Sequence, residues 1–309
     1  MPGPRPQPLG VARDLPLPLD EEAVDEPRRR GPWKLIAAII VLLLGTGGLV
    51  MHRTGLLSLS SLPFVGSGQT LPVVKAPQES LKESPLKSFA GTADEIDANF
   101  QKAALWKLMK KEFPDWYKER LVETVKLRTD KLDDQAIAVH LTRMMVELRR
   151  KHTADAFAAR PVHLRNVAQA FVDNLTRLTK VSTEACYRFI SGGETDPKMI
   201  ELMRTPEHTA SMQTQMLTIF EAIADGRTTK AKHEQAVRKD YDTLSTQLAV
   251  RGWSPADLAL FDDARALSQA PPQKVCQMVN DWFAAQLAIK DEATQTRLFV
   301  STLKPLIGG

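Results

Sequence analysis

The two cysteines of this sequence, Cys186 and Cys276, lie ninety residues apart in stretches with a helical hydrophobic pattern. Neither has a second Cys or a His at the short spacing that zinc ligands require. In an oxidising compartment two such residues can form a disulfide, whereas in a reducing cytosol they would be buried free thiols. The pattern leaves both alternatives open, and the choice depends on where the domain lies.

The six histidines are scattered along the chain. A zincin site needs two histidines four residues apart with a glutamate between them, and the nearest fragment, His233-Glu234, lacks the second histidine. His140, His152 and His163 recur at intervals of about twelve residues. They could converge only if successive helices pack together, so the sequence predicts no metal-binding residue.

Candidate hydrolase residues are equally sparse. The motif Ser-x-x-Lys of penicillin-binding enzymes occurs twice, but the S-D-N and K-T-G elements that those enzymes also need do not occur. Acidic pairs stand at Asp262-Asp263 and Asp291-Glu292. Neighbouring residues on a helix point about 100° apart, so neither pair has the spacing of a catalytic dyad. The sequence predicts no catalytic residue and no cofactor.

An aromatic cluster, Trp106, Phe113, Trp116 and Tyr117, is the other candidate for function. Aromatic side chains build cores, and they also form platforms for sugar rings and peptides. We expect half of the cluster to lie in the core. Trp116 and Tyr117 are the candidates for lining a binding groove.

The elements that would position these residues are helices. From Thr92 onward apolar residues recur three and four positions apart, and no segment alternates as a strand would. Thr92 and Glu95 have the spacing of a capping box, Gly226 is expected to end one helix, and residues 229–250 to form the next. Further boundaries are predicted at Pro114, Asp133, Pro161, Gly192, Pro197, Pro206, Gly252, Pro255 and Pro272. We expect an all-α domain, a bundle of roughly nine or ten helices.

A membrane helix is predicted at Leu35–Met51, seventeen residues without a charge. A helix of that length reaches roughly 25 Å, and flanking Trp33 and His52 can extend it at the two interfaces. A cleaved signal peptide is the alternative. It is disfavoured because a 34-residue leader precedes the apolar run and no A-x-A site follows, so the segment is interpreted as an uncleaved signal anchor.

Charges beside this segment predict its orientation. Arg28, Arg29, Arg30 and Lys34 precede it, and Arg53 is the only Lys or Arg in the twenty residues that follow. Positive charge stays on the cytoplasmic side, so the N-terminus should be cytoplasmic. The C-terminal domain would then be extracytoplasmic, and we expect the protein in the inner (plasma) membrane with that domain in the periplasm.

The chain therefore divides into four segments. Residues 1–32 form a Pro-rich cytoplasmic tail that is expected to be disordered, and residues 33–53 the single transmembrane helix. Residues 54–91 are rich in Ser, Pro and Gly and are expected to be a flexible linker. Residues 92–309 would be the helical extracytoplasmic domain.

Charge gives no sign of a nucleic-acid partner. The chain carries 41 Lys and Arg against 37 Asp and Glu, a net charge of +4, and the charges are interspersed along the C-terminal region. A nucleic-acid surface would gather its basic residues on one face or in one block. We therefore expect no nucleic acid among the partners.

Architecture is the strongest functional signal in this sequence. A tail, one membrane helix, a tether and a helical domain are typical of a bitopic membrane protein that binds or scaffolds another envelope protein. Two alternatives stay open. One is an extracytoplasmic hydrolase acting on envelope polymer, and the other is a ligand-sensing domain that signals to the cytoplasmic tail.

Overall fold

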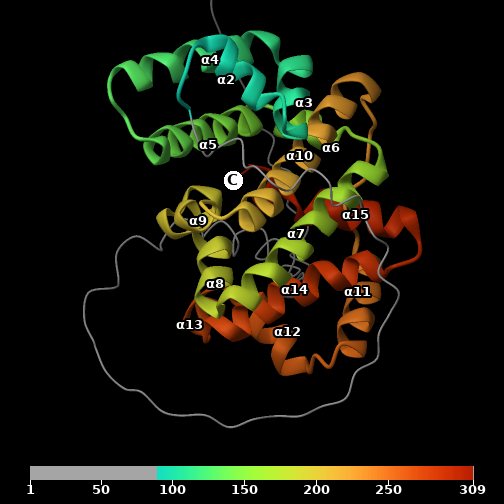
Figure 1. Cartoon of the computed structure of the whole chain (residues 1–309). Coiled ribbons are helices and arrows are strands. Elements are labelled where there is room, and N and C mark those ends of the chain that lie inside the picture. Colours follow the sequence, from blue (N-terminus) through green and yellow to red (C-terminus); the bar gives the residue numbers. More distant parts are fainter. Residues whose placement is uncertain (1–88, 309) are drawn as a thin grey trace, which may run out of the picture. The chain divides into compact units, whose positions relative to one another are not determined.

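A computed structural model describes residues 89–308 of the chain (Figure 1). Within this range all regular structure is helical, with fifteen α-helices and one 3-10 turn and no strand, so the all-α prediction is confirmed for these residues. The helices are α2 (Ala93–Phe100), α3 (Ala104–Glu112), α4 (Pro114–Thr129), α5 (Asp134–Lys151), α6 (Thr153–Phe157), α7 (Pro161–Val181), α8 (Thr183–Gly192), η2 (Gly193–Thr195), α9 (Pro197–Leu202), α10 (Pro206–Thr229), α11 (Arg238–Val250), α12 (Pro255–Asp262), α13 (Ala264–Gln269), α14 (Pro272–Ala288), α15 (Glu292–Thr302) and α16 (Lys304–Gly308).

Residues 1–88 lie outside the described part of the chain. They hold the predicted tail, the predicted membrane helix Leu35–Met51 and all but the last three residues of the predicted linker. Among the residues that the structure does describe, no helix is both long enough and apolar enough to cross a bilayer.

Local signals in the sequence start the helices where they were predicted. The Thr92 hydroxyl accepts a hydrogen bond from the Glu95 N–H at 3.4 Å, and the Glu95 carboxylate accepts one from the Thr92 N–H at 2.7 Å. These two bonds form the expected capping box. Proline occupies the first turn of α4, α7, α9, α10, α12 and α14, where no backbone N–H is needed.

The predicted number of helices, nine or ten, is too low. The stretch from Pro161 to Gly192 was expected to be one helix, but Ser182 has an extended backbone and its side chain accepts a hydrogen bond from the Ala185 N–H. Ser182 thereby caps α8 and separates it from α7. The helix opened by Thr92 is also divided, at residues 101–103, into α2 and α3, but there no side chain caps the second helix.

The prediction of a helix over residues 229–250 is wrong in its first part. α10 continues to Thr229, Lys230 adopts a left-handed conformation with φ 51°, and no helix is present between residues 230 and 237. The Ala231 N–H donates to the Ala158 carbonyl at 2.8 Å, and the His233 ring nitrogen Nε2 lies 2.7 Å from the Ala159 carbonyl oxygen. These tertiary hydrogen bonds replace the helical ones.

Gly226 does not end a helix, which corrects a second boundary. It lies inside α10, where α10 packs closely against α6, and a Cβ at this position would be 1.8 Å from the Asp155 carbonyl oxygen. The glycine is needed because the two backbones approach too closely for any side chain.

Substituting Gly226→Ala should therefore destabilise the domain. In an open helix interior this change stabilises by about 0.5–1 kcal/mol, but here the methyl group must displace backbone, at a cost of about 2–3 kcal/mol. Urea unfolding followed by circular dichroism measures the difference. Thr228→Ala, at an exposed position of the same helix, should change stability by less than about 0.5 kcal/mol. Greater stability of the Gly226→Ala protein would contradict the close packing.

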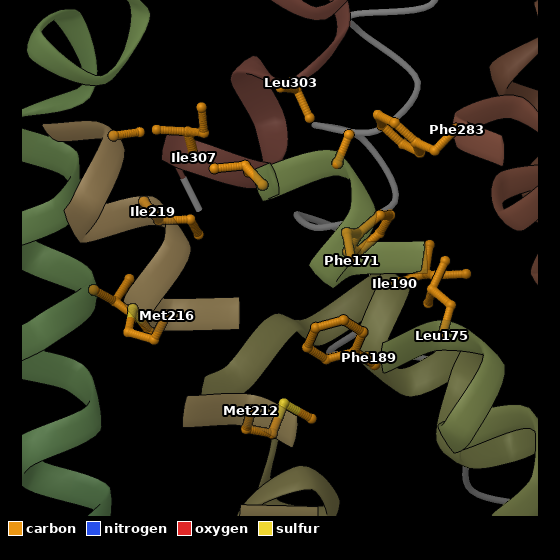
Figure 2. Packing of buried hydrophobic residues seen from close by; sticks show 14 of the residues in the cluster. Phe171, Leu175, Phe189, Ile190, Met212, Met216, Ile219, Phe283, Leu303 and Ile307 are labelled. Carbon is orange, nitrogen blue, oxygen red and sulfur yellow. The ribbon is translucent and has the colours of Figure 1, made fainter. Parts of the chain in front are cut away.

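α7 and α10 lie at the centre of the described residues (Figure 1) and pack against each other. α7 also packs against α8, α14 and α15, and α10 against α3 and α6. Figure 2 shows side chains that fill the space between these helices, among them Phe171 of α7 and Phe283 of α14. The two rings pack edge to face, with their centroids 5.1 Å apart. Phe89, the first described residue, is fully buried and packs against Phe100, so the core includes it.

An ion pair between Asp240 and Arg297 fastens α11 to α15. The Asp240 carboxylate is nearly fully buried and lies 2.6 Å from the Arg297 guanidinium. It also accepts hydrogen bonds from the Val237 N–H at 2.9 Å and from the Thr294 hydroxyl at 3.2 Å. The hydrogen bond from Arg297 is the largest cause that lowers the pKa of Asp240, to about 2.

The low pKa makes stability depend on acid pH. A carboxylate whose pKa is lower in the folded than in the unfolded state stabilises fully above the unfolded value, and that stabilisation is lost as pH falls through the folded value. We expect Asp240 to contribute up to about 2 kcal/mol, lost between about pH 4 and pH 2. Asp240→Asn should lower stability at pH 7 and flatten this part of the pH profile. Asp242→Asn, exposed on the same helix, should leave the profile unchanged, and an equal effect of both substitutions would refute the assignment.

Candidate functional site

The two aromatic candidates lie at the edge of a buried cluster. Tyr117 is only 3% exposed, and its hydroxyl donates to Asp97 at 2.6 Å and accepts from the Gln101 amide at 2.8 Å. Trp116 packs against the core with part of its ring exposed, and the Arg120 guanidinium lies 5.8 Å from the ring centre. That Trp116 or Tyr117 lines a binding groove stays a prediction.

The two cysteines meet between α8 and α14. Their Cα atoms are 6.1 Å apart and the structure joins Cys186 and Cys276 in a disulfide. Both side chains are buried, at 0% and 2% exposure, beside the apolar faces of their helices. The bond closes a loop of ninety residues and ties the start of α8 to the start of α14.

The three histidines spaced along the first half of the domain do not converge. Each lies near a different carboxylate: His140 with Glu123 at 3.0 Å, His152 with Asp155 at 2.7 Å and His163 with Asp225 at 3.5 Å. Across residues 89–308 no group of three or more His, Cys, Asp or Glu side chains is placed to hold a metal ion.

Helix termini account for most of the paired acids. Asp263 caps α13 by accepting from the N–H groups of Arg265 and Ala266, and Asp291 caps α15 by accepting from the Thr294 N–H. Asp262 differs, because burial and the neighbouring Asp263 raise the pKa of its carboxyl group. One of its oxygens is buried without a hydrogen-bond partner.

A groove between α7 and the first turn of α10 is a candidate site within residues 89–308. Its volume is about 650 Å³, within the range of about 300–1,000 Å³ typical of ligand sites in proteins. The lining residues are Asp173, Thr176, Arg177, Lys180 and Val181 of α7 and Glu207 and His208 of α10. We call this feature the α7/α10 groove.

Buried polar contacts hold α7 and α10 together next to the α7/α10 groove. Asn174, 1% exposed, donates from its amide to the Gln215 side chain at 3.0 Å and accepts from the Ser211 hydroxyl at 2.8 Å. The neighbouring Leu175 and Leu178 are buried in the core. With the inner face of α7 fixed in this way, its polar positions 173, 176, 177 and 180 must face the groove.

These contacts continue inward from the groove to α5. The Gln215 amide donates to Glu194 at 3.3 Å, and the Arg149 guanidinium donates to the same carboxylate oxygen at 2.8 Å. Burial acts to raise the pKa of Glu194, but the charge and hydrogen bonds of Arg149 outweigh it and hold the pKa below its usual value. A buried hydrogen-bonded network therefore links Asn174 of α7 to a buried ion pair.

Some polar and charged side chains of the α7/α10 groove have partners within the chain, and others do not. Asp173 accepts from the Gln169 amide at 2.9 Å, and Glu207 lies 3.8 Å from the Arg177 guanidinium. Within residues 89–308, the side chains of Lys180 and His208 have no hydrogen bond or ion pair. No side chain caps the first turn of α10. The first N–H groups of this helix therefore donate to no capping side chain.

The sequence did not single out these residues as a site. The spacing of Asp173, Arg177 and Lys180 is that of a polar helix face, which most often faces water. The Thr205-Pro206 signal did predict the start of α10. That this start lies beside the polar face of α7 depends on tertiary packing, for which no local pattern exists.

No known protein family, curated protein or solved structure that was compared matches this chain. Function must therefore be inferred from the chemistry of the chain itself. The α7/α10 groove offers space and exposed polar side chains of both charges.

Proposed function

We propose that this chain is a single-pass membrane protein whose helical domain lies outside the cytoplasm and binds another protein of the cell envelope. The α7/α10 groove is part of the docking surface. The observation that carries the proposal is an open groove of about 650 Å³ in which Lys180 and His208 are available for a partner.

The membrane part of the proposal rests on the uncharged segment Leu35–Met51 and on the positive charges that precede it. A disulfide between Cys186 and Cys276 supports an oxidising compartment for the domain, because such bonds persist mainly outside the cytosol. A C-terminal reporter that is active only outside the cytoplasm should therefore give signal. A reporter that fluoresces only in the cytoplasm should stay dark, and the reverse result would overturn the orientation.

Site-specific photocrosslinking tests the docking surface. A photoreactive amino acid replaces Val181, which is 42% exposed at the groove, or Val250, which is 80% exposed on α11. The full chain is then irradiated in the membranes of the cells that produce it. We expect the Val181 position to form a discrete heavier species with a second protein that the Val250 position does not form.

Reversing the charge of groove residues tests whether the crosslinked species depends on the α7/α10 groove. Arg177→Glu with Lys180→Glu should abolish the crosslink from position 181, whereas Lys239→Glu, at an exposed site on α11, should not. A crosslink that survives reversal in the groove, or equal crosslinking from positions 181 and 250, would refute docking through the α7/α10 groove.

One observation favours a second candidate, the envelope hydrolase. Asp262 has a buried, unpartnered oxygen, and its pKa is raised, as it is for catalytic acids. Purified envelope polymer incubated with the full chain and with its Asp262→Asn variant distinguishes the two functions. Release of soluble fragments by the unsubstituted chain, and not by its Asp262→Asn variant, would favour the hydrolase.

A further inference from the structure

We infer that the α7/α10 groove recognises an acidic peptide segment, in which a carboxylate binds between Lys180 and His208 and a neighbouring apolar side chain packs on Val181. This inference rests on the proposed function and deepens it. It names the chemistry of the partner segment, which the proposed function leaves open.

The charge balance of the groove carries the inference. Its two carboxylates already have partners within the chain, Asp173 with Gln169 and Glu207 with Arg177. Its two unengaged polar side chains, Lys180 and His208, are both able to donate hydrogen bonds. A ligand that completes the groove must therefore supply acceptors, and a negative charge is favoured beside the ammonium group of Lys180.

α10 adds to the same preference. It is 24 residues long, its N-terminus opens at the groove, and no side chain caps its first N–H groups. The partial positive charge at a helix N-terminus favours an anion there. Lys180 and this helix terminus therefore act on a bound carboxylate from two sides of the groove.

The remaining lining residues favour a peptide over a phosphate group. Asp173 and Glu207 lie in the same groove and would repel a phosphate monoester, whose charge is about −1.5 to −2, more than a single carboxylate. The volume of about 650 Å³ far exceeds what one anionic group fills. The exposed Val181 adds apolar contact for a side chain of a peptide. The Thr176 hydroxyl already has partners within the chain, because it donates to the Val172 carbonyl at 2.8 Å and accepts from the Asn280 amide at 3.1 Å.

Selection from a random peptide library tests the inference with the full chain in detergent. Displayed peptides of about twelve residues are selected on the wild-type protein, and the best is measured by fluorescence anisotropy. We expect enrichment of Asp or Glu next to an apolar residue. Replacing that acid by its amide, or Lys180 by Glu, should weaken binding by about tenfold or more, and Lys239→Glu should not.

A charge swap guards against a variant that misfolds. A peptide with Lys in place of its acid should bind the Lys180→Glu protein more tightly than the original acidic peptide does, which a misfolded protein cannot produce. Lys180→Gln should weaken binding of the acidic peptide without a gain for the basic one. Selection of peptides without acidic residues, or binding of the acidic peptide that is unaffected by Lys180→Glu, would overturn the inference.

The two proposals fail separately. A groove-dependent crosslink from position 181 together with a library that shows no acidic preference would leave the docking surface standing and reject the acidic segment. A crosslink to a bound lipid or small phosphate in place of a protein would reject both.

Discussion

Arg149→Met is expected to lower the free energy of unfolding by about 3–5 kcal/mol, because it leaves a buried carboxylate without its cation. The Arg149 side chain is 1% exposed and that of Glu194 is 10% exposed, and the two are joined at 2.8 Å. Methionine keeps much of the volume of arginine. The fall in the free energy of unfolding therefore comes from the unpaired charge of Glu194 and not from a cavity. Urea unfolding of the purified chain at pH 7 measures it.

The double substitution Arg149→Met with Glu194→Gln should recover much of this loss. Replacing both partners of a buried pair is often close to neutral, whereas removing one of them is costly. Arg143→Met, exposed on the same helix, should change stability by less than about 0.5 kcal/mol. If Glu194→Gln added its own cost in full to that of Arg149→Met, the two residues would not be energetically coupled.

The Arg149→Met protein should also respond to pH in a characteristic direction. Without the guanidinium, burial is opposed only by the hydrogen bonds from Gln215 and from the backbone, and we expect it to raise the pKa of Glu194, so that the folded state takes up a proton more readily than the unfolded state. The stability deficit of the variant should therefore be smaller at pH 5 than at pH 8. A deficit that grows as the pH falls would exclude this explanation.

Reduction of the disulfide between Cys186 and Cys276 should have the second large effect. Opening a loop of ninety residues lowers stability by roughly 4 kcal/mol if the bond acts on the entropy of the unfolded chain. For a domain of about 200 residues this corresponds to a fall in melting temperature of roughly 10 °C. Thermal melts of the oxidised protein with and without a reductant that does not itself absorb in the far ultraviolet provide the comparison.

Cys186→Ala with Cys276→Ala supplies the matched control. This protein should melt near the temperature of the reduced wild type, and reductant should not shift it further. Thiol labelling of the denatured, unreduced wild type should modify neither cysteine. Quantitative labelling of both cysteines in protein taken directly from its cells would show two free thiols and would remove the support that the disulfide lends to an oxidising compartment.

Local sequence patterns were sufficient to predict the class of the fold and the start of most helices. The capping box of Thr92 and Glu95 and the first-turn prolines act within a few residues of where they stand, so local patterns were sufficient to find them. The apolar stripe of the stretch after Pro161 likewise predicted the inner face of α7. The predicted membrane anchor at Leu35–Met51 stays a prediction from sequence alone.

Where local signals compete or are absent, packing between distant segments determines the helix boundaries. Ser182 could continue a helix or cap the next one, and in the folded chain it caps α8, the helix that carries Cys186. Residues 230–237 have a helical pattern, but hydrogen bonds from Ala231 and His233 to the carbonyls of residues 158 and 159 hold them in an irregular path. Packing with a distant segment outweighs intrinsic helix propensity, which is worth less than about 1 kcal/mol per residue for ordinary residues.

The α7/α10 groove depends on tertiary structure for the same reason. Lys180 and His208 are 28 positions apart in the chain, and each alone is an ordinary polar residue on a helix. The buried contacts of Asn174 with Ser211 and Gln215 bring their two helices together and leave the groove above them. Local sequence encodes a helix and its polar face, but which two faces meet depends on interactions between residues far apart in the sequence, and no local pattern contains that information.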